Sequence, residues 1–305
     1  MVILRIFLTI KLFNIVCSIY FFKKVGGQLK IKLTSFFLLL ICTIYYSVYV
    51  EPTSIRTKHL TFSDNRLNSN TTIKLIQISD THFNNKKDIE RFKKVVKNLN
   101  QIKPDFILFT GDLVSDIRKF SYKNEVIRLL KELNPKIGKL AIYGNHDHGG
   151  YFTEQYEELL TESNFILLKN EEKTYYVQKQ KVSFIGLDDY MLGNKQYNDI
   201  LERIQKNSYT VVLAHEPDIA DLTKNYPINL QLSGHSHGGQ IYLPFYKSFI
   251  MPPYAKKYNR GVYTLSSKYN SHLVVSNGIG TTKLPIRLFT PPEIVSIKIT
   301  GQIKK

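Results

Sequence analysis

Cysteine is almost absent from this sequence. Only two occur in the 305 residues, and both, Cys17 and Cys42, lie in apolar stretches near the N-terminus. The rest of the chain can therefore hold no disulfide framework, no thiol nucleophile and no zinc site built from thiolates. Internal repeats and low-complexity tracts are lacking as well. A hydrophobic content of 43% excludes a disordered chain and predicts a packed core.

Acidic residues are scarce relative to basic ones. Forty-two Lys and Arg stand against 25 Asp and Glu, which gives a net charge of +17, and the first fifty residues contain no acid at all. Such an excess suits an anionic surface or substrate, such as lipid headgroups, phosphates or nucleic acid. A lysine bias that only aids solubility explains it equally well. The lysines are scattered and no aromatic–basic RNA motif occurs, so nucleic acid is not expected as a substrate.

The N-terminal residues 1–50 predict a membrane anchor. Residues 33–50 form an uninterrupted apolar run, close to the about 20 residues that span a bilayer. Residues 12–22 are a possible second span or an amphipathic lead-in. The lysine-rich residues 23–32 predict a cytoplasmic loop, which places everything after residue 50 outside the cytoplasm. A cleaved signal peptide is the alternative, but no small-residue cleavage site follows the run.

Residues 51–71 are polar and predict a linker, and residues 72–300 predict one α/β domain. Helical spacing of apolar residues occurs over 86–102, 119–133, 153–163 and 198–206. Short β-branched runs predict strands at 73–79, 105–110, 139–144, 182–187, 209–215, 228–234 and 272–278. Strands that alternate with helices, followed mostly by strands, predict a layered α/β fold with a central mixed sheet.

Polar side chains gather where these runs end. They are Asp80 and His82, then Asp112, then Asn145, His146 and Asp147, then His215, and finally His235 and His237. Each group alone also fits a turn, a helix cap or a buried structural histidine. In open α/β sheets, however, sites form at the carboxyl ends of strands, so we expect these groups to meet.

Together the groups predict a two-metal hydrolase. Two aspartates, one asparagine and four histidines form a mixed nitrogen and oxygen ligand set, which suits Mn, Fe, Co, Ni or Zn. One carboxylate able to bridge, with three further ligands for each ion, fits a dinuclear site. Ions about 3.5–4 Å apart clamp both the attacking and the leaving oxygen of a phosphoryl group.

The same residues resemble the calcineurin-like metallophosphoesterase superfamily. The blocks are DTH at 80–82, GD at 111–112, GNHD at 144–147, His215 and GHSH at 234–237. The longer GHSHGGQ, GLDD at 186–189 and the segment 276–294 resemble its bacterial membrane-associated YkuE/YaeI-like branch. Asn277 departs from that branch, where an arginine is expected. The resemblance covers residues 72–300 and implies an α/β/β/α sandwich with the metal site at the carboxyl ends of the strands.

The resemblance also implies a role for each residue. Asp80, His82 and His237 would hold one metal, Asn145, His215 and His235 the other, and Asp112 would bridge the two. His146 would stabilise charge at phosphorus and protonate the leaving oxygen, with its ring oriented by Asp147. The nucleophile would be a hydroxide that bridges the metals, and the bond cleaved a phosphomonoester, phosphodiester or pyrophosphate. An anchor beside a basic domain suggests a lipid-linked substrate.

Other residues and functions carry weaker signals. Asp188 and Asp189 fit a cap or a site wall, Arg287 a substrate phosphate or a salt bridge, and His148, Gly149 and Gly150 the mouth of the site or a turn. His272 carries no evident chemistry. The alternative functions are a UDP-2,3-diacylglucosamine pyrophosphatase of lipid A biosynthesis, which needs a cytoplasmic site, and a non-catalytic metal-binding module. Metal identity and oligomeric state stay open.

Overall fold

A computed structural model describes residues 27–148, 153–248, 251–266 and 268–302. The chain divides between Ser47 and Val48 into two compact units. Helix α2 (Gly27–Tyr45) belongs to the first unit, and the π-helical turn that continues it (Tyr46–Val50) includes the boundary between the units. Gln28–Thr53 is long and apolar enough to cross a membrane, a criterion that a signal sequence also meets. The predicted segment 12–22 lies outside the described residues.

The start of α2 corrects one prediction. Lys30 and Lys32 lie in the helix, although residues 23–32 were predicted as a loop. Lysine has a good helix propensity, and its aliphatic stem lets the ammonium extend away from an apolar helix. No glycine or proline follows Gly27 until the helix has ended.

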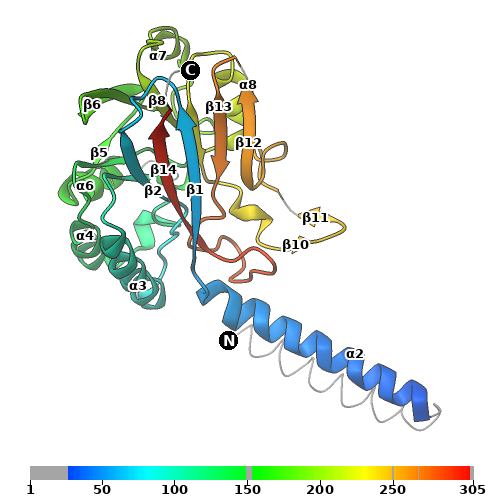
Figure 1. Cartoon of the computed structure of the whole chain (residues 1–305). Coiled ribbons are helices and arrows are strands. Elements are labelled where there is room, and N and C mark those ends of the chain that lie inside the picture. Colours follow the sequence, from blue (N-terminus) through cyan, green and yellow to red (C-terminus); the bar gives the residue numbers. More distant parts are fainter. Residues whose placement is uncertain (1–26, 149–152, 249–250, 267, 303–305) are drawn as a thin grey trace. The chain divides into compact units, whose positions relative to one another are not determined.

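The second unit contains two six-stranded sheets (Figure 1). The first has the order β1 (Arg56–Asp64), β14 (Glu293–Gly301), β2 (Thr72–Ile78), β3 (Phe106–Phe109), β4 (Gly138–Ala141) and β5 (Ile166–Leu167). The second has the order β12 (Gly261–Ser266), β13 (Ser271–Val275), β9 (Leu230–Ser233), β8 (Tyr209–Leu213), β7 (Gln180–Gly186) and β6 (Glu171–Val177). β2, β3, β4 and β5 are mutually parallel, as are β7, β8, β9 and β13.

Helices cover the outer face of each sheet, so the predicted α/β/β/α layering is confirmed. The first sheet packs against α3 (Lys86–Ile102), α4 (Lys123–Lys131) and α6 (Thr153–Glu162), and the second packs next to α7 (Asn198–Glu202) and α8 (Ala220–Thr223). The two sheets meet through a shared apolar core that includes Leu75, Phe106, Phe184 and Val211. Shorter elements are α5 (Asn145–His148), β10 (Tyr242–Leu243), β11 (Lys247–Ser248) and 3-10 turns at Glu51–Thr53, Ile117–Lys119, Pro217–Ile219 and His237–Gly239.

Residues 51–71 are not the predicted linker, because they include β1. This strand pairs in parallel with β14 along its whole length, and Leu60 and Phe62 pack against the core between the sheets. β1 is an edge strand with one exposed face, so it lacks the continuous apolar run of a buried strand. The half-exposed edge strands β6 and β12 were missed for the same reason. Helix α4 begins at Lys123 instead of residue 119, because a 3-10 turn precedes it.

Candidate metal centre

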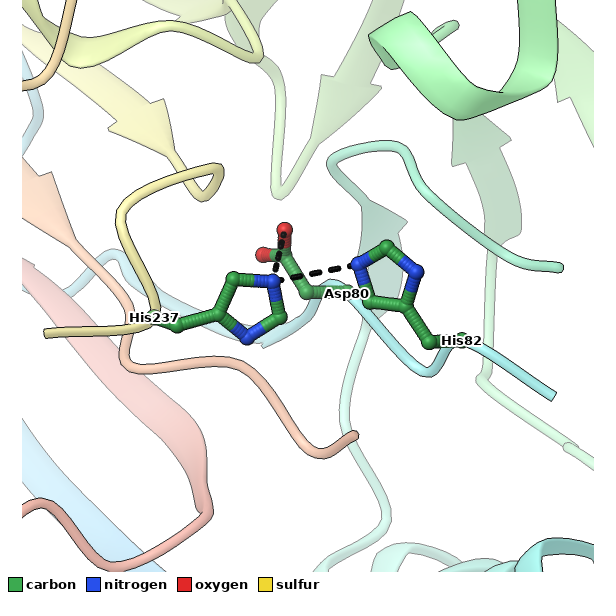
Figure 2. Close-up of side chains that lie close together, drawn as sticks. All are labelled: Asp80, His82 and His237. Atoms are coloured by element: carbon green, nitrogen blue, oxygen red, sulfur yellow. Dashed lines mark hydrogen bonds and ion pairs between the residues drawn. The ribbon is translucent and has the colours of Figure 1, made fainter. Parts of the chain in front are cut away.

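The predicted ligands lie in the five segments that directly follow β2, β3, β4, β8 and β9, with Asn145 at the start of α5 and His237 in a 3-10 turn. Both sheets contribute, since β2, β3 and β4 belong to the first and β8 and β9 to the second. Figure 2 shows the result for one part of the site, where His237 from the loop after β9 points toward Asp80 and His82 from the loop after β2. The expectation that the strand ends meet is therefore confirmed.

The potential ligand atoms form three overlapping groups, and within each group they lie within 4.8 Å of one another. The groups are Asp80, His82 and His237; Asp112, His215 and His235; and His82, Asp112 and His146. In the first group, His237 Nε2 lies 3.1 Å from His82 Nε2 and 3.6 Å from Asp80 Oδ1 (Figure 2). All of these side chains except His146 are buried.

Asp112, a member of the second group, also lies next to His82 of the first. Its Oδ2 is 3.4 Å from His82 Nε2 and 3.3 Å from His215 Nε2. One carboxylate oxygen thus faces one imidazole of each group, which is the arrangement expected of a bridging ligand. Its Oδ1 accepts the backbone N–H of His146 at 2.8 Å, and this bond fixes the orientation of the carboxylate.

Each of three imidazoles is held by its second nitrogen. His82 Nδ1 lies 3.2 Å from Ser115 Oγ, His215 Nδ1 lies 2.7 Å from the Thr110 carbonyl, and His235 Nε2 lies 2.9 Å from the Pro253 carbonyl. Such outer contacts fix the tautomer and leave the other nitrogen for a metal. The sequence reasoning missed these partners, because two of them act through backbone carbonyls.

Five of the ligand residues adopt backbone conformations that non-glycine residues rarely adopt. Asp80, His82, Asp112, His235 and His237 all have φ between 42° and 64°. Non-glycine residues in this region carry strain that the surrounding fold must hold in place, and such residues cluster at functional sites.

Glycines make room around the ligands. Gly111 has a φ of 92°, and a Cβ there would lie 2.6 Å from the backbone nitrogen of Gly144 and 2.7 Å from His215 Nδ1. A Cβ at Gly144 would likewise collide with Asp112 Oδ1. The close approach of these two loops therefore requires glycine at both positions.

The charge states suit a cation site. Burial alone would raise the pKa of Asp112, but the adjacent His215 and His82 imidazoles lower it well below its usual value. Burial lowers the pKa of His82 to about 3 and that of His235 to about 4. At neutral pH the site therefore presents an ionised Asp112 carboxylate and neutral His82 and His235 rings, the forms that bind metals. Burial would lower the pKa of His215, but the Asp112 and Asp80 carboxylates raise it well above its usual value, so a metal that binds this ring would displace a proton.

Asn145 supplies an independent indication that the residues fit a metal. Its Oδ1 is buried and has no hydrogen-bond partner among the residues that the structure describes. A buried, unpaired amide oxygen costs roughly 1–3 kcal/mol, and a bound cation would satisfy it. The donor set of nitrogen and oxygen atoms suits Mn, Fe, Co, Ni or Zn.

Comparison with known proteins agrees with this geometry. The family model described as calcineurin-like phosphoesterase matches residues 73–239. The chain belongs to the calcineurin-like phosphoesterase family. It is 42% identical over 251 residues to the uncharacterized metallophosphoesterase YkuE of Bacillus subtilis, with 82% of this chain and 87% of YkuE covered.

Two further proteins are less similar to this phosphoesterase. The UDP-2,3-diacylglucosamine pyrophosphatase LpxG of Chlamydia muridarum is 26% identical over 275 residues, covering 73% of this chain and 82% of LpxG. The crystal structure of TT1561 of Thermus thermophilus is similar with a TM-score of 0.46 and 12% identity, covering 68% of this chain and 91% of that one.

The pair His146 and Asp147 of the phosphoesterase differs from expectation in one respect. His146 Nδ1 lies 2.9 Å from the Ser115 carbonyl, which fixes the ring. Both Asp147 oxygens instead accept backbone N–H groups, from Asp112 at 2.7 Å, Gly144 at 2.8 Å and Leu113 at 3.1 Å. The prediction that Asp147 orients His146 is therefore wrong, and Asp147 ties together the loops after β3 and β4. The Asp147 carboxylate binds three backbone N–H groups in place of the His146 imidazole.

Arg287 has a structural role that neither sequence interpretation included. Its guanidinium is fully buried and donates to the backbone carbonyls of Asn277, Gly278, Gly280 and Thr290. It therefore holds the segment after β13 in place and is not available to a substrate phosphate.

The remaining candidates lie around the centre. His148 Nε2 is 2.6 Å from Asp188 Oδ1, and Asp188 Oδ2 accepts the N–H of Asn194, so Asp188 shapes a turn and orients His148. Asp189 caps the same turn by accepting from the N–H of Leu192. The Asn277 N–H donates to Glu293. His272 lies on β13 against Phe62. Gly149 and Gly150 lie outside the described residues.

Proposed function

We propose that this phosphoesterase is a membrane-anchored hydrolase that uses two divalent metal ions to cleave a phosphomonoester, phosphodiester or pyrophosphate bond. The observation that carries the proposal is the position of Asp112 Oδ2, 3.4 Å from His82 Nε2 and 3.3 Å from His215 Nε2. One ion would be held by Asp80, His82 and His237. The other would be held by Asn145, His215 and His235, and Asp112 would bridge them.

The mechanism divides between the ions and the side chains. Divalent ions bound here would supply Lewis acidity and would lower the pKa of coordinated water to about 7. The Ser115 carbonyl only accepts hydrogen bonds, so His146 keeps a proton on Nδ1. Nε2 is then the nitrogen left for the substrate, and the doubly protonated ring carries there the proton that moves to the leaving oxygen, which leaves the ring neutral with its proton on Nδ1. Ser115 also contacts His82 through Oγ, so one residue positions a ligand and the proton donor together.

A lipid-linked or other envelope phosphate is the substrate class that we propose. The excess of basic residues favours an anionic partner, and the candidate membrane helix would keep the domain at a bilayer. The lysines of residues 23–32, at the N-terminal end of the apolar run, support an extracytoplasmic domain. The 26% identity to LpxG supports a lipid-linked substrate in general, and this topology does not favour the LpxG reaction itself.

Metal-dependent hydrolysis by the full-length protein tests the proposal. We would purify the chain in detergent, remove metals with a chelator, and measure hydrolysis of bis-p-nitrophenyl phosphate and p-nitrophenyl phosphate with and without added Mn²⁺. We expect Mn²⁺ to restore activity, and Asp112→Asn to lower it roughly 100-fold or more, because a bound ion contributes several kcal/mol. Metal analysis of the same variant should show fewer bound ions.

The matched control is Asp116→Asn, which removes the same charge from the same loop. Asp116 pairs with Arg118 at 2.8 Å and belongs to none of the ligand groups. This variant should keep its activity. A wild-type protein that binds Mn²⁺ but hydrolyses neither ester would point to the non-catalytic metal-binding module instead.

A further inference from the structure

Two neighbouring segments present large apolar side chains to solvent. Phe245 and Tyr246, at the tip of the β10–β11 hairpin, are 94% and 78% exposed. Leu284 and Phe289, in the loop that precedes β14, are 61% and 54% exposed. We call these four side chains the apolar rim. Phe245 is the most exposed large hydrophobic residue in the part of the chain that the structure describes.

Hydrogen bonds join the two segments into one surface. The Tyr242 N–H donates to the Leu288 carbonyl at 2.9 Å, and the Leu288 N–H donates to the Gln240 carbonyl at 2.8 Å. The Gln240 side chain donates to the Leu284 carbonyl at 3.1 Å and accepts from the Thr282 N–H at 2.6 Å. The hairpin and the loop are therefore fixed to each other.

The same surface is hydrogen-bonded to the C-terminal end of the candidate membrane segment. The buried Glu51 carboxylate accepts the backbone N–H groups of Phe289 at 3.0 Å and Thr290 at 2.6 Å. Glu51 itself falls within Gln28–Thr53, the segment long and apolar enough to cross a membrane. If that segment lies in a membrane, the loop that contains Phe289 is close to the bilayer, because it is hydrogen-bonded to Glu51.

Cationic side chains border the apolar rim. Lys283 is exposed next to Leu284. The Arg260 guanidinium lies 4.3 Å from the centroid of the Tyr242 ring and donates to the Phe289 carbonyl at 3.3 Å. Aromatic and aliphatic side chains flanked by Lys and Arg are typical of proteins that lie in the membrane interface, where anionic headgroups meet the acyl chains.

The surface is also continuous with the metal centre. His237, Gly238 and Gly239 form a 3-10 turn that leads directly into Gln240 and the hairpin. Ser248, on the returning strand β11, donates to the Gly238 carbonyl at 2.9 Å. A membrane in contact with the hairpin would therefore lie next to the loop that carries a metal ligand.

We propose that the apolar rim inserts into the bilayer interface and holds the loop that carries His237 close to the lipid headgroups. This inference rests on the membrane anchoring in the function proposed above. The partner is the lipid surface, and a second copy of the chain or another protein would be a different outcome.

The chain has no tryptophan, so a single introduced tryptophan reports on one position alone. We would place full-length F245W and L284W in liposomes whose lipids carry bromine on the upper acyl chain, and measure fluorescence quenching relative to unbrominated liposomes. Interfacial segments bury their apolar face about 5–10 Å below the headgroups. We therefore expect both variants to lose most of their emission. The matched control is Y176W, because Tyr176 is 72% exposed on the edge strand β6, and its emission should stay.

The outcomes separate the two proposals. Protein that floats with the liposomes while F245W and L284W stay as bright as Y176W overturns the lipid-contacting surface and leaves the anchor intact. Equal quenching of all three variants also overturns it, because the contact would not be confined to the apolar rim. An emission shift of F245W that grows with protein concentration in detergent, without quenching in liposomes, would assign the surface to a second copy. A chain that fails to float overturns the anchor and the surface together.

Discussion

Replacing His146 by alanine separates its two possible roles. His146 belongs to a group with His82 and Asp112 that could hold a metal, yet the interpretation above makes it a proton donor. Its Nδ1 is occupied by the Ser115 carbonyl at 2.9 Å, so the ring has one nitrogen left for chemistry. The bond from the His146 backbone N–H to Asp112 survives the substitution. The bridging carboxylate therefore keeps its orientation, and we expect both metals to remain bound.

The size of the expected effect follows from the lost proton transfer. A positioned acid or base contributes about 100- to 10,000-fold, which corresponds to roughly 3–5 kcal/mol of activation free energy. We would measure kcat and metal content on the same preparation, with two phosphodiester substrates that differ in leaving group. An alkoxide needs a proton far more than nitrophenolate does, so the loss should be larger for the alkyl ester.

Two results would refute this reasoning. A fall in bound metal would make His146 a ligand, and an equal loss for both leaving groups would remove its role as an acid. His59→Ala is the control, since His59 is exposed on β1 and belongs to none of the ligand groups. This variant should match the wild type in both measurements.

Two further predictions concern stability. Arg287→Met leaves four buried carbonyls without a donor and should lower the free energy of unfolding by at least about 3 kcal/mol. Thermal or denaturant unfolding measures this change. A loss below about 1 kcal/mol would show that the segment after β13 keeps its conformation without Arg287. Burial, and then the charge of Lys131, lowers the pKa of Lys139 from 10.5 to about 8. Between these pH values the unfolded chain binds a proton that the folded protein lacks, so stability should rise with pH by an amount on the order of 2 kcal/mol. Lys139→Met should unfold with the same free energy at pH 8 and pH 10, and a wild type equally flat over this range would contradict the assignment.

The ligands were predictable because their position depends on local pattern. Asp80, Asp112 and His235 each follow a short buried run, and the carboxyl ends of parallel strands lie at one edge of a sheet. Side chains at that edge of each sheet lie close together, and the packing of the two sheets against each other brings both sets into one site. The order of the layers follows from the same alternation of strands and helices.

Roles that depend on distant backbone groups were not predictable. Asp147 was expected to orient a ring, and it accepts three amides that become neighbours only after the loops fold. Arg287 was expected to contact a substrate phosphate or to form a salt bridge. Its guanidinium instead donates hydrogen bonds to backbone carbonyls. The pairing of β1 with β14, more than 200 residues later in the chain, was likewise not predictable. Residue type and spacing carry no information about such contacts.

The position of β14 sets an order of events during synthesis. β14 lies between β1 and β2, parallel to the first and antiparallel to the second (Figure 1). β1 and β2 are consecutive and antiparallel, the arrangement of an ordinary hairpin, yet they must stay apart. Glu293 is made 229 residues after Asp64, which takes roughly 10–50 s at typical translation rates. During that time β2, which leads into Asp80, has β3 as a neighbour but lacks β14, so this side of the metal centre gains its full sheet only after β14 has been made.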